Sequence, residues 1–263
     1  MINKIKLFVK DTKQAKKTEE LVKKELVNSK YQEVNESYDL AISIGGDGTF
    51  IKMIHSNNFN SNIYYAAINA GSLGFLTTVD HSEFTKLFNS LDNNSYKVRE
   101  MNLLKVEVVT EKETKEYFCI NELTIRKNNY STMKGDLYID NVLFEQFAGD
   151  GVVVSTPVGS SAYSLTLGGS LVDNNLNAFE VTPLAPLNSK IFKPFNNSIV
   201  LNSNRKMTFV PNGNNDLCIL TDGKIINLNN VKRVTCTLPN KTIKTIVLDD
   251  YNYIKQIHTK LVD

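Results

Sequence analysis

The sequence predicts two domains, an α/β domain with a parallel sheet over residues 1–95 and a β-rich domain over residues 96–249. Two observations lead to this prediction. In the first range, apolar runs alternate with segments of helical periodicity, which is typical of a parallel sheet with crossover helices. In the second range, short segments alternate between apolar and polar residues, as the strands of antiparallel sheets do.

The elements of the first domain follow from the spacing of apolar residues. The segment 38–44 is apolar from Leu40 onward apart from one serine, which indicates a strand buried on both faces. The last helix of the domain has Asp80 or Ser82 as its candidate N-cap. The expected elements are, in order, strand 2–9, helix 13–28, strand 38–44, helix 48–56, strand 63–69 and helix 84–91.

The second domain is expected to consist mainly of hairpins. The pair Asp140-Asn141 fits a tight turn, and Asp222-Gly223 between two apolar runs is a strong hairpin signal. A helix-like pattern is evident only over 160–169. The first strands of this domain are expected at 105–109, 117–126, 136–140 and 142–147, and further apolar segments follow between 198 and 248.

Composition and charge exclude several classes of protein. A formal net charge of +2 gives no support for binding nucleic acid or a membrane surface, so we expect neither as a partner. Cys119, Cys218 and Cys236 are far apart and form no CxxC pair, which argues against a disulfide framework or a zinc site. We see no secretory signal and no apolar run of the 18 or so residues that a membrane span needs, and we therefore expect a cytoplasmic protein.

The segment Ile44–Thr49, with the sequence IGGDGT, joins the buried strand to a helical pattern. Glycine N–H groups approach phosphate closely, and a helix N-terminus favours an anion. The spacing matches neither GxxxxGK[ST] nor GxGxxG, so the acidic residue needs its own explanation. In one interpretation Asp47 caps the helix. In the other, its carboxylate orients a hydroxyl and accepts its proton as the oxygen attacks phosphorus.

Four motifs together resemble the NAD kinase family in its compact bacterial, Gram-positive-like form. They have the family's order and spacing over about residues 40–170. GGDGT alone is a weak signal, because diacylglycerol and sphingosine-type lipid kinases and phosphofructokinases carry close relatives of it. The four motifs are GGDGT at 45–49, NAGSLGFLT at 69–77, NE at 121–122 and GDGVVVSTPVGSSAYSLTLGG at 149–169.

The resemblance implies a fold and an activity. The fold is the NAD kinase-like two-domain fold, an α/β domain followed by a β-rich domain, with the tail over about 250–263 packed back on the first domain. The activity is transfer of a phosphoryl group from ATP or polyphosphate to the 2′-hydroxyl of the adenosine ribose of NAD, which gives NADP. The expected cofactor is a divalent metal, Mg²⁺, carried by the donor phosphates, since no metal site made of protein ligands is evident. The family also implies a homotetramer.

The resemblance assigns roles residue by residue. Asp47 matches the catalytic aspartate. Asn121 and Glu122 match a pair that would contact the adenine edge and the ribose hydroxyls, and Asp150 would face the nicotinamide side. The remaining nucleotide-binding positions are Gly45, Gly46, Gly48 and Thr49 in the loop, Phe75 beside the pocket, Ser161, Ala162, Tyr163 and Thr166 at the start of a helix that serves as a dinucleotide platform, and Ala185 and Lys190.

Three positions depart from the family pattern. Val158 stands where Ser is common, Ser161 where Thr is frequent and Phe192 where some relatives have Tyr. None of them touches the expected chemistry, so they concern the affinity for NAD. Asp222-Gly223 also matches a family site, although the hairpin explains it.

Two other functions are compatible with part of the sequence. A lipid kinase of the diacylglycerol type would explain GGDGT but not the NE pair or the segment STPVGSSAY. A non-catalytic sensor of NAD or NADP would explain the nucleotide-binding residues but not the intact GGDGT motif.

Overall fold

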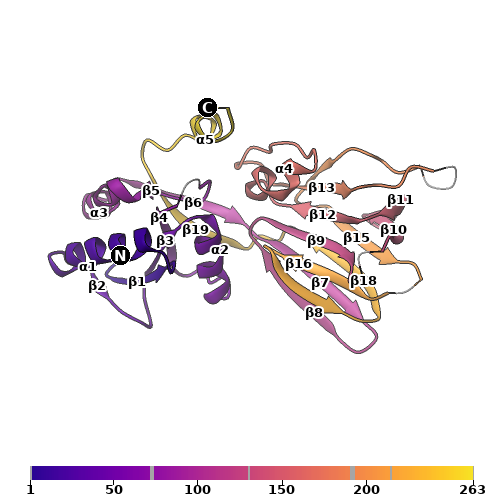
Figure 1. The fold of residues 1–263 in the computed structure, drawn as a ribbon, viewed down its shortest axis with the longest axis horizontal. Coiled ribbons are helices and arrows are strands. Elements are labelled where there is room, and N and C mark those ends of the chain that lie inside the picture. Colours follow the sequence, from indigo (N-terminus) through magenta and orange to yellow (C-terminus); the bar gives the residue numbers. More distant parts are fainter. Residues whose placement is uncertain (1, 72–73, 130, 190–192, 214, 263) are drawn as a thin grey trace. The chain divides into compact units, whose positions relative to one another are not determined.

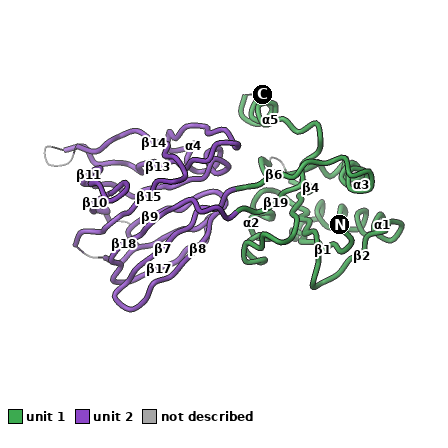
Figure 2. Tube along the Cα trace, turned by 180° about the vertical axis from the view of Figure 1, so that it is seen from behind, with its two compact units in different colours: residues 1–101, 242–263 green, residues 102–241 purple. Residues whose placement is uncertain are grey.

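The computed structural model describes residues 2–71, 74–129, 131–189, 193–213 and 215–262. These residues form two compact units, residues 1–101 with 242–263, and residues 102–241 (Figure 2). Both expected architectures are present: a mostly parallel sheet with helices in the first unit, and antiparallel sheets in the second (Figure 1). Within the described residues, we find no helix with the length and apolar character that a membrane crossing requires.

The first unit is a seven-stranded sheet in the order β2-β1-β3-β4-β19-β6, with β5 also paired to β4. The registers from β2 to β19 are parallel. The strands are β1 (Lys4–Val9), β2 (Gln32–Glu33), β3 (Leu40–Gly45), β4 (Tyr64–Asn69), β5 (Val79–Asp80), β6 (Tyr96–Asn102) and β19 (Thr242–Leu248), and the helices are α1 (Lys13–Val27), α2 (Asp47–Ser56), α3 (Phe84–Asp92) and α5 (Tyr253–Ile257).

Local sequence fixes the ends of these helices. Thr12 caps α1 by accepting the N–H of Ala15, and Asp80 accepts the N–H of Ser82 at the 3₁₀ turn before α3. Apolar residues of α1 and α3 share one core with the strands, whereas the buried residues of α2 lie outside that cluster. Helix α2 packs against β3 and β1, so its first turn is fixed by the most buried strand of the sheet.

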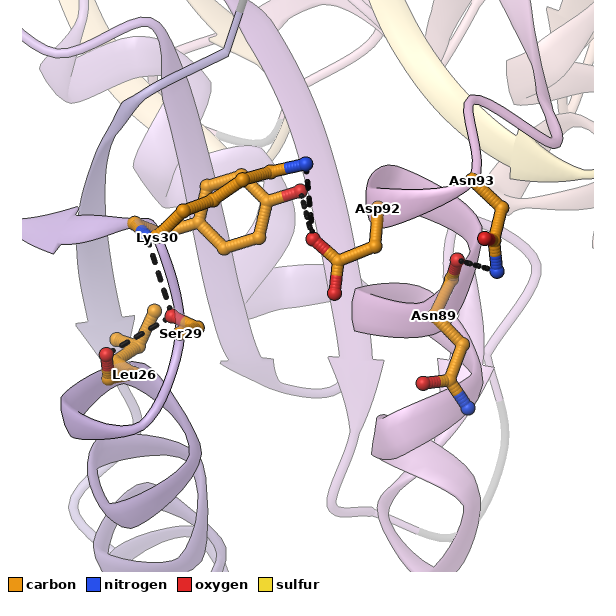
Figure 3. Close-up of polar contacts among 7 residues, drawn as sticks. Leu26, Ser29, Lys30, Asn89, Asp92 and Asn93 are labelled. Atoms are coloured by element: carbon orange, nitrogen blue, oxygen red, sulfur yellow. Dashed lines mark hydrogen bonds and ion pairs between the residues drawn. The ribbon is translucent and has the colours of Figure 1, made fainter.

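A polar connection joins the end of α1 to α3 (Figure 3). The carboxylate of Asp92 accepts a hydrogen bond from the Tyr31 hydroxyl at 3.0 Å and forms an ion pair with Lys30 at 3.1 Å. The hydroxyl of Ser29 closes the last turn of α1 by donating to the carbonyl of Leu26 at 2.9 Å. These contacts hold the two helices that cover the same core.

The second unit contains two six-stranded antiparallel sheets, in the orders β11-β10-β15-β18-β7-β8 and β14-β13-β12-β9-β16-β17. Apolar side chains of both sheets form one core, which includes Leu104, Leu123, Phe179 and Phe209. The strands are β7 (Leu104–Thr110), β8 (Thr114–Cys119), β9 (Glu122–Lys127), β10 (Met133–Ile139), β11 (Val142–Gly149), β12 (Gly151–Ser155), β13 (Ala178–Leu184), β14 (Ile199–Asn202), β15 (Lys206–Pro211), β16 (Leu217–Thr221), β17 (Lys224–Leu228) and β18 (Val231–Thr237).

Both expected tight turns are confirmed. Asp140-Asn141 connects β10 to β11 and Asp222-Gly223 connects β16 to β17, and all four residues have positive φ, as two-residue hairpin turns require. The three cysteines are unpaired, and two of them are buried.

Three details differ from the sequence-based expectation. The units divide at 101/102 and 241/242 rather than at 95/96 and 249/250, because β6 and β19 pair within the first sheet. The expected strand 117–126 is broken at Ile120-Asn121. The expected helix 160–169 shrinks to α4 (Tyr163–Thr166), which follows a 3₁₀ turn over Val158–Ser161.

Candidate functional site

The glycine turn of the first unit follows directly from β3. Gly46 is the N-cap of α2 and Asp47 is its first residue, and the cap makes no side-chain hydrogen bond. The interpretation of Asp47 as a helix cap is therefore wrong. The Asp47 side chain instead turns towards the segment that follows β4.

The Asp47 carboxylate accepts two backbone hydrogen bonds from that segment. The N–H of Phe75 donates to Oδ2 at 2.7 Å, and the N–H of Leu76 donates to Oδ1 at 2.9 Å. A Cβ on Gly74 would lie 2.9 Å from the same Oδ1, so glycine allows this close approach. The GGDGT motif and the NAGSLGFLT motif are thus joined through one side chain.

Burial raises the pKa of Asp47, and this effect outweighs three influences that lower it. Those influences are the hydrogen bonds from Phe75 and Leu76 and the positive charge of Lys260. Each carboxylate oxygen uses one lone pair for a backbone N–H and retains acceptor capacity. Asp47 can therefore be held in place and still accept a further hydrogen bond from a hydroxyl.

The glycines of the turn have different surroundings. A Cβ on Gly45 would lie 2.8 Å from Thr49 Cβ, so Gly45 is required by the packing of the turn itself. A Cβ on Gly48 would meet no atom within 4 Å, and Gly48 is exposed at the start of α2. Phe75 is half-buried and lies outside the core clusters of apolar residues. Gly48 and Phe75 are therefore free of the packing constraints that explain Gly45.

A pocket of about 430 Å³ lies on one side of this turn. Two exposed lysines, Lys10 after β1 and Lys52 in α2, contribute to it, and neither makes an ion pair within the part of the chain that the structure describes. Positive charge beside a helix N-terminus suits a phosphate group. Sequence analysis missed both lysines; the position of Lys10 directly after β1 was the available signal. The pocket is lined by Phe8, Val9, Lys10, Asp11, Gly46, Gly48, Thr49, Lys52, Met53 and Ser56.

The second unit places Asn121 and Glu122 at the break between β8 and β9. The carboxylate of Asp222 accepts hydrogen bonds from the backbone N–H groups of Ile120 at 2.9 Å, Asn121 at 2.7 Å and Glu122 at 3.3 Å. Sequence analysis explained Asp222 as a hairpin residue, and this is only half of its role. The missing information was that the hairpin tip lies against the NE pair.

Two acceptor oxygens of the NE pair are buried without a partner. They are Oδ1 of Asn121 and Oε2 of Glu122, which make no hydrogen bond within the described residues. Burial, followed by the nearby charge of Asp222, raises the pKa of Glu122 to about 7. Unpartnered buried acceptors are costly and indicate a ligand with hydrogen-bond donors.

The turn after β12 is attached to the NE pair. The N–H of Thr156 donates to the carbonyl of Asn121 at 2.9 Å. A Cβ on Gly159 would lie 2.6 Å from the Cα of Asn121, so glycine is needed there for close contact. Val158, which stands where Ser is common in the family, is buried in this turn.

The segment around α4 is held by a buried carboxylate. Glu180 is fully buried on β13 and accepts hydrogen bonds from the hydroxyl of Ser164 at 2.9 Å and the N–H of Ser170 at 2.7 Å. Ser161 and Thr166 donate their hydroxyl protons to nearby carbonyls, those of Val158 and Tyr163. The helix that begins here has only four residues and so has little dipole of its own, and the dinucleotide platform stays a prediction that rests on the side chains and backbone of this segment.

The remaining candidate residues have less distinctive surroundings. Ala162 is half-buried and Tyr163 is exposed, while Asp150 is exposed in the turn between β11 and β12. Ala185 follows β13 with φ of 43°, and its carbonyl would lie 2.9 Å from a Cβ on Gly149. Lys190 and Phe192 lie outside the described residues.

Comparison with protein families matches both units of the chain. The model of the ATP-NAD kinase N-terminal domain matches residues 1–96, and that of the ATP-NAD kinase C-terminal domain matches residues 120–248. The chain belongs to the NAD kinase family. It has the activity of that family, that of an ATP-NAD kinase, and the lipid-kinase and sensor alternatives are set aside.

Curated relatives agree with this assignment. An NAD kinase of Finegoldia magna is 32% identical over 260 residues, which is 95% of each chain. NAD kinase 2 of Bacillus subtilis is 34% identical over 229 residues, which is 85% of each chain. The resemblance to bacterial NAD kinases, Gram-positive ones among them, is thus confirmed.

Two solved structures share the fold at 19% identity. One is a yeast NADH kinase complexed with NADH, which gives a TM-score of 0.86 over 99% of this chain and 87% of the other. The second is an NAD kinase from Archaeoglobus fulgidus in complex with ATP, which gives a TM-score of 0.75 over 98% of both chains. The NAD kinase fold that the sequence predicts is confirmed.

The pKa of Glu122 generates a prediction about stability. In the folded chain this pKa is about 7, above the usual value of 4.5, so the folded state binds more protons than the unfolded state between these pH values. The contribution of Glu122 to the free energy of unfolding therefore falls as the pH rises through this window. The free energy of unfolding of Glu122→Gln minus that of wild type should therefore increase by about 1–3 kcal/mol when the pH is raised from 4 to 8.

Urea unfolding at pH 4, 6 and 8 measures this difference. Glu113→Gln is the matched control, because the Glu113 side chain is half exposed and should show no comparable change with pH. A difference between Glu122→Gln and wild type that stays constant from pH 4 to pH 8 would contradict the prediction.

Proposed function

We propose that this ATP-NAD kinase transfers the γ-phosphoryl group of ATP to the 2′-hydroxyl of the adenosine ribose of NAD, and that Asp47 is the catalytic residue. The observation that carries this proposal is that two backbone N–H groups hold the Asp47 carboxylate in place in the glycine turn before α2. In the reaction, the ribose O2′ forms a bond to the γ-phosphorus as the bond to the β–γ bridging oxygen breaks. The hydroxyl proton passes to Asp47, and ADP leaves.

The pocket beside the glycine turn supports binding of the phosphoryl donor there. Gly46, Gly48 and Thr49 present backbone at the start of α2, and Lys10 and Lys52 add two positive charges. These groups recognise a chain of phosphates, and a polyphosphate has the same chemistry as the triphosphate of ATP. We therefore propose this pocket as the donor site for either compound. The two family models, both described as domains of ATP-NAD kinase, favour ATP as the donor.

The unpartnered acceptors of the second unit support binding of NAD there. The Asn121 amide both accepts and donates, as an adenine edge requires, and the Glu122 carboxylate accepts from ribose hydroxyls. We propose that Phe75, Asp150, Ser161, Ala162, Tyr163, Thr166, Ala185 and Lys190 complete the contacts to nucleotide. The yeast relative of known structure is an NADH kinase, so the reduced dinucleotide should be assayed beside NAD.

A divalent cation, Mg²⁺, is part of this proposal. The described residues contain no group of three or more His, Cys, Asp or Glu side chains arranged to hold a metal ion. The donor phosphates would therefore carry the ion, with the pocket residues binding the phosphates. When bound, Mg²⁺ would neutralise charge that develops on the phosphate oxygens. NAD and ATP are cytoplasmic metabolites, and we propose a cytoplasmic enzyme.

Asp47→Asn tests the catalytic role. The amide is isosteric with the carboxylate but does not accept a proton from the ribose hydroxyl, so kcat should fall by about 10²–10⁴-fold. Steady-state formation of NADP from NAD and ATP with Mg²⁺ measures the effect, and the melting temperature and circular dichroism establish that the variant is folded. Turnover near the wild-type value in a folded variant would rule out this role for Asp47.

Gly48→Ala tests the donor site. The added methyl group meets no protein atom, and alanine favours the helix, so the melting temperature should be unchanged or higher. The same methyl group would lie where donor phosphates approach the backbone, and KM for ATP should rise about tenfold, while KM for NAD serves as an internal control. An unchanged KM for ATP would show that the donor binds elsewhere.

The edge strand β11 supports the homotetramer that the family implies. Val142, Leu143 and Phe144 are exposed on this edge, and Phe144 makes an edge-on contact with the exposed Phe195. An apolar edge strand is a favourable surface for association with a second copy. We propose that β11 forms part of a subunit interface.

Light scattering tests this assembly. At micromolar concentration the mass should be close to four times the 29.6 kDa of the chain. Val142→Lys should lower the mass, whereas Val27→Lys, at the exposed end of α1, should not. A monomeric wild-type protein would contradict the proposal.

A further inference from the structure

The segment after β19 makes a hydrogen-bonded connection to the loop that holds Asp47. The side-chain amide of Gln256, in α5, donates from Nε2 to the carbonyl of Phe75 at 3.2 Å. The N–H of the same Phe75 donates to Asp47 Oδ2 at 2.7 Å. One residue of the loop is thus held on both sides of its backbone, by Gln256 and by Asp47.

Gln256 is in turn held by a chain of hydrogen bonds that begins at a half-buried cation, Arg99. The Arg99 guanidinium, on β6, donates to the Tyr251 hydroxyl at 2.6 Å and lies over the ring of Tyr251, 5.2 Å from its centroid. The Tyr251 hydroxyl donates to Gln256 Oε1 at 3.2 Å. Since the Phe75 carbonyl only accepts, the amide nitrogen of Gln256 faces it, and the amide oxygen is left to accept from the Tyr251 hydroxyl.

The chemistry of this chain explains why an amide stands at position 256. The Phe75 carbonyl requires a donor and the Tyr251 hydroxyl requires an acceptor, and a glutamine side chain provides one of each. A carboxylate would accept from Tyr251 but would not donate to Phe75 at neutral pH. An aliphatic side chain of the same size would do neither.

We propose that Gln256 is a positioning residue for Asp47, and that the segment 251–256 thereby forms part of the catalytic apparatus. This inference rests on the catalytic role of Asp47 proposed above. Without the bond from Gln256, the Phe75-Leu76 backbone is free to shift, and the Asp47 carboxylate loses its fixed direction. KM for ATP should be little affected, because Gln256 bonds to none of the residues that line the donor pocket, whereas KM for NAD can change through Phe75. Lys260, from the same tail, also helps to keep Asp47 ionised by lowering its pKa against the effect of burial.

Gln256→Leu is the primary test, with Lys255→Leu as its matched control on the exposed side of the same helix. Gln256→Leu should lower kcat about tenfold and change KM for ATP less than threefold, whereas Lys255→Leu should change neither. Amide hydrogen exchange gives a readout that is independent of activity. The N–H groups of Phe75 and Leu76 should exchange at least tenfold faster in Gln256→Leu and at the wild-type rate in Lys255→Leu. Wild-type exchange or a kcat within twofold of wild type would overturn the inference.

A double-mutant cycle with Asp47→Asn separates this inference from the function on which it rests. If Gln256 acts through Asp47, adding Gln256→Leu to Asp47→Asn should lower kcat no further. Multiplicative effects of the two substitutions would show that Gln256 acts by another route, and would overturn the inference. Wild-type turnover in Asp47→Asn alone would instead refute the catalytic role of Asp47.

Gln256→Glu keeps the inference testable if the leucine variant does not fold. This substitution retains the side-chain size and the bond from Tyr251 but loses the donor to Phe75 while the new carboxyl is ionised. Protonation restores an O–H donor. The ratio of its kcat to that of wild type should therefore rise towards one as the pH falls through the pKa of the new carboxyl. A ratio that is independent of pH would overturn the inference.

Discussion

The site of the first unit depends on one interaction, in which the Asp47 carboxylate accepts hydrogen bonds from two backbone N–H groups. It joins the turn after β3 to the loop after β4, two segments that a parallel sheet brings to the same edge. Charge-assisted hydrogen bonds of this kind are stronger than neutral ones. The loop and the carboxylate therefore fix each other, and the absence of a side chain at Gly74 lets them approach.

The second unit uses the same device with another aspartate. Asp222 accepts hydrogen bonds from the N–H groups of Ile120, Asn121 and Glu122, at the break between β8 and β9. Its negative charge also contributes, after burial, to the raised pKa of Glu122. Both units thus use a carboxylate in a tight turn to organise main-chain N–H groups, and both have acceptor oxygens close to that turn that retain capacity for a further hydrogen bond.

The sequence was sufficient for the architecture and for the identity of the motifs, because both depend on local patterns. The buried run from Leu40, the two positive-φ turns and the change of period near residue 96 all have local causes. The roles that were missed depend on contacts between distant positions. Asp222 lies 100 residues from Glu122, and Gln256 lies 181 residues from Phe75. The pairing of β19 with β4, which brings the end of the chain into the first sheet, is likewise not visible in the pattern of either strand.

Hydrogen bonds from two N–H groups favour the ionised form of a carboxylate and so lower its proton affinity. By themselves they would make Asp47 a weaker base. Burial acts in the opposite direction and is the larger effect, so the pKa of Asp47 is raised. A base whose proton affinity exceeds that of an ordinary aspartate accepts the proton of an alcohol more readily in the transition state. The same N–H groups fix the direction of the remaining lone pairs, and so provide the orientation that a displacement at phosphorus requires. The bonds that reduce the basicity of Asp47 are therefore offset by burial and contribute the geometry that catalysis needs.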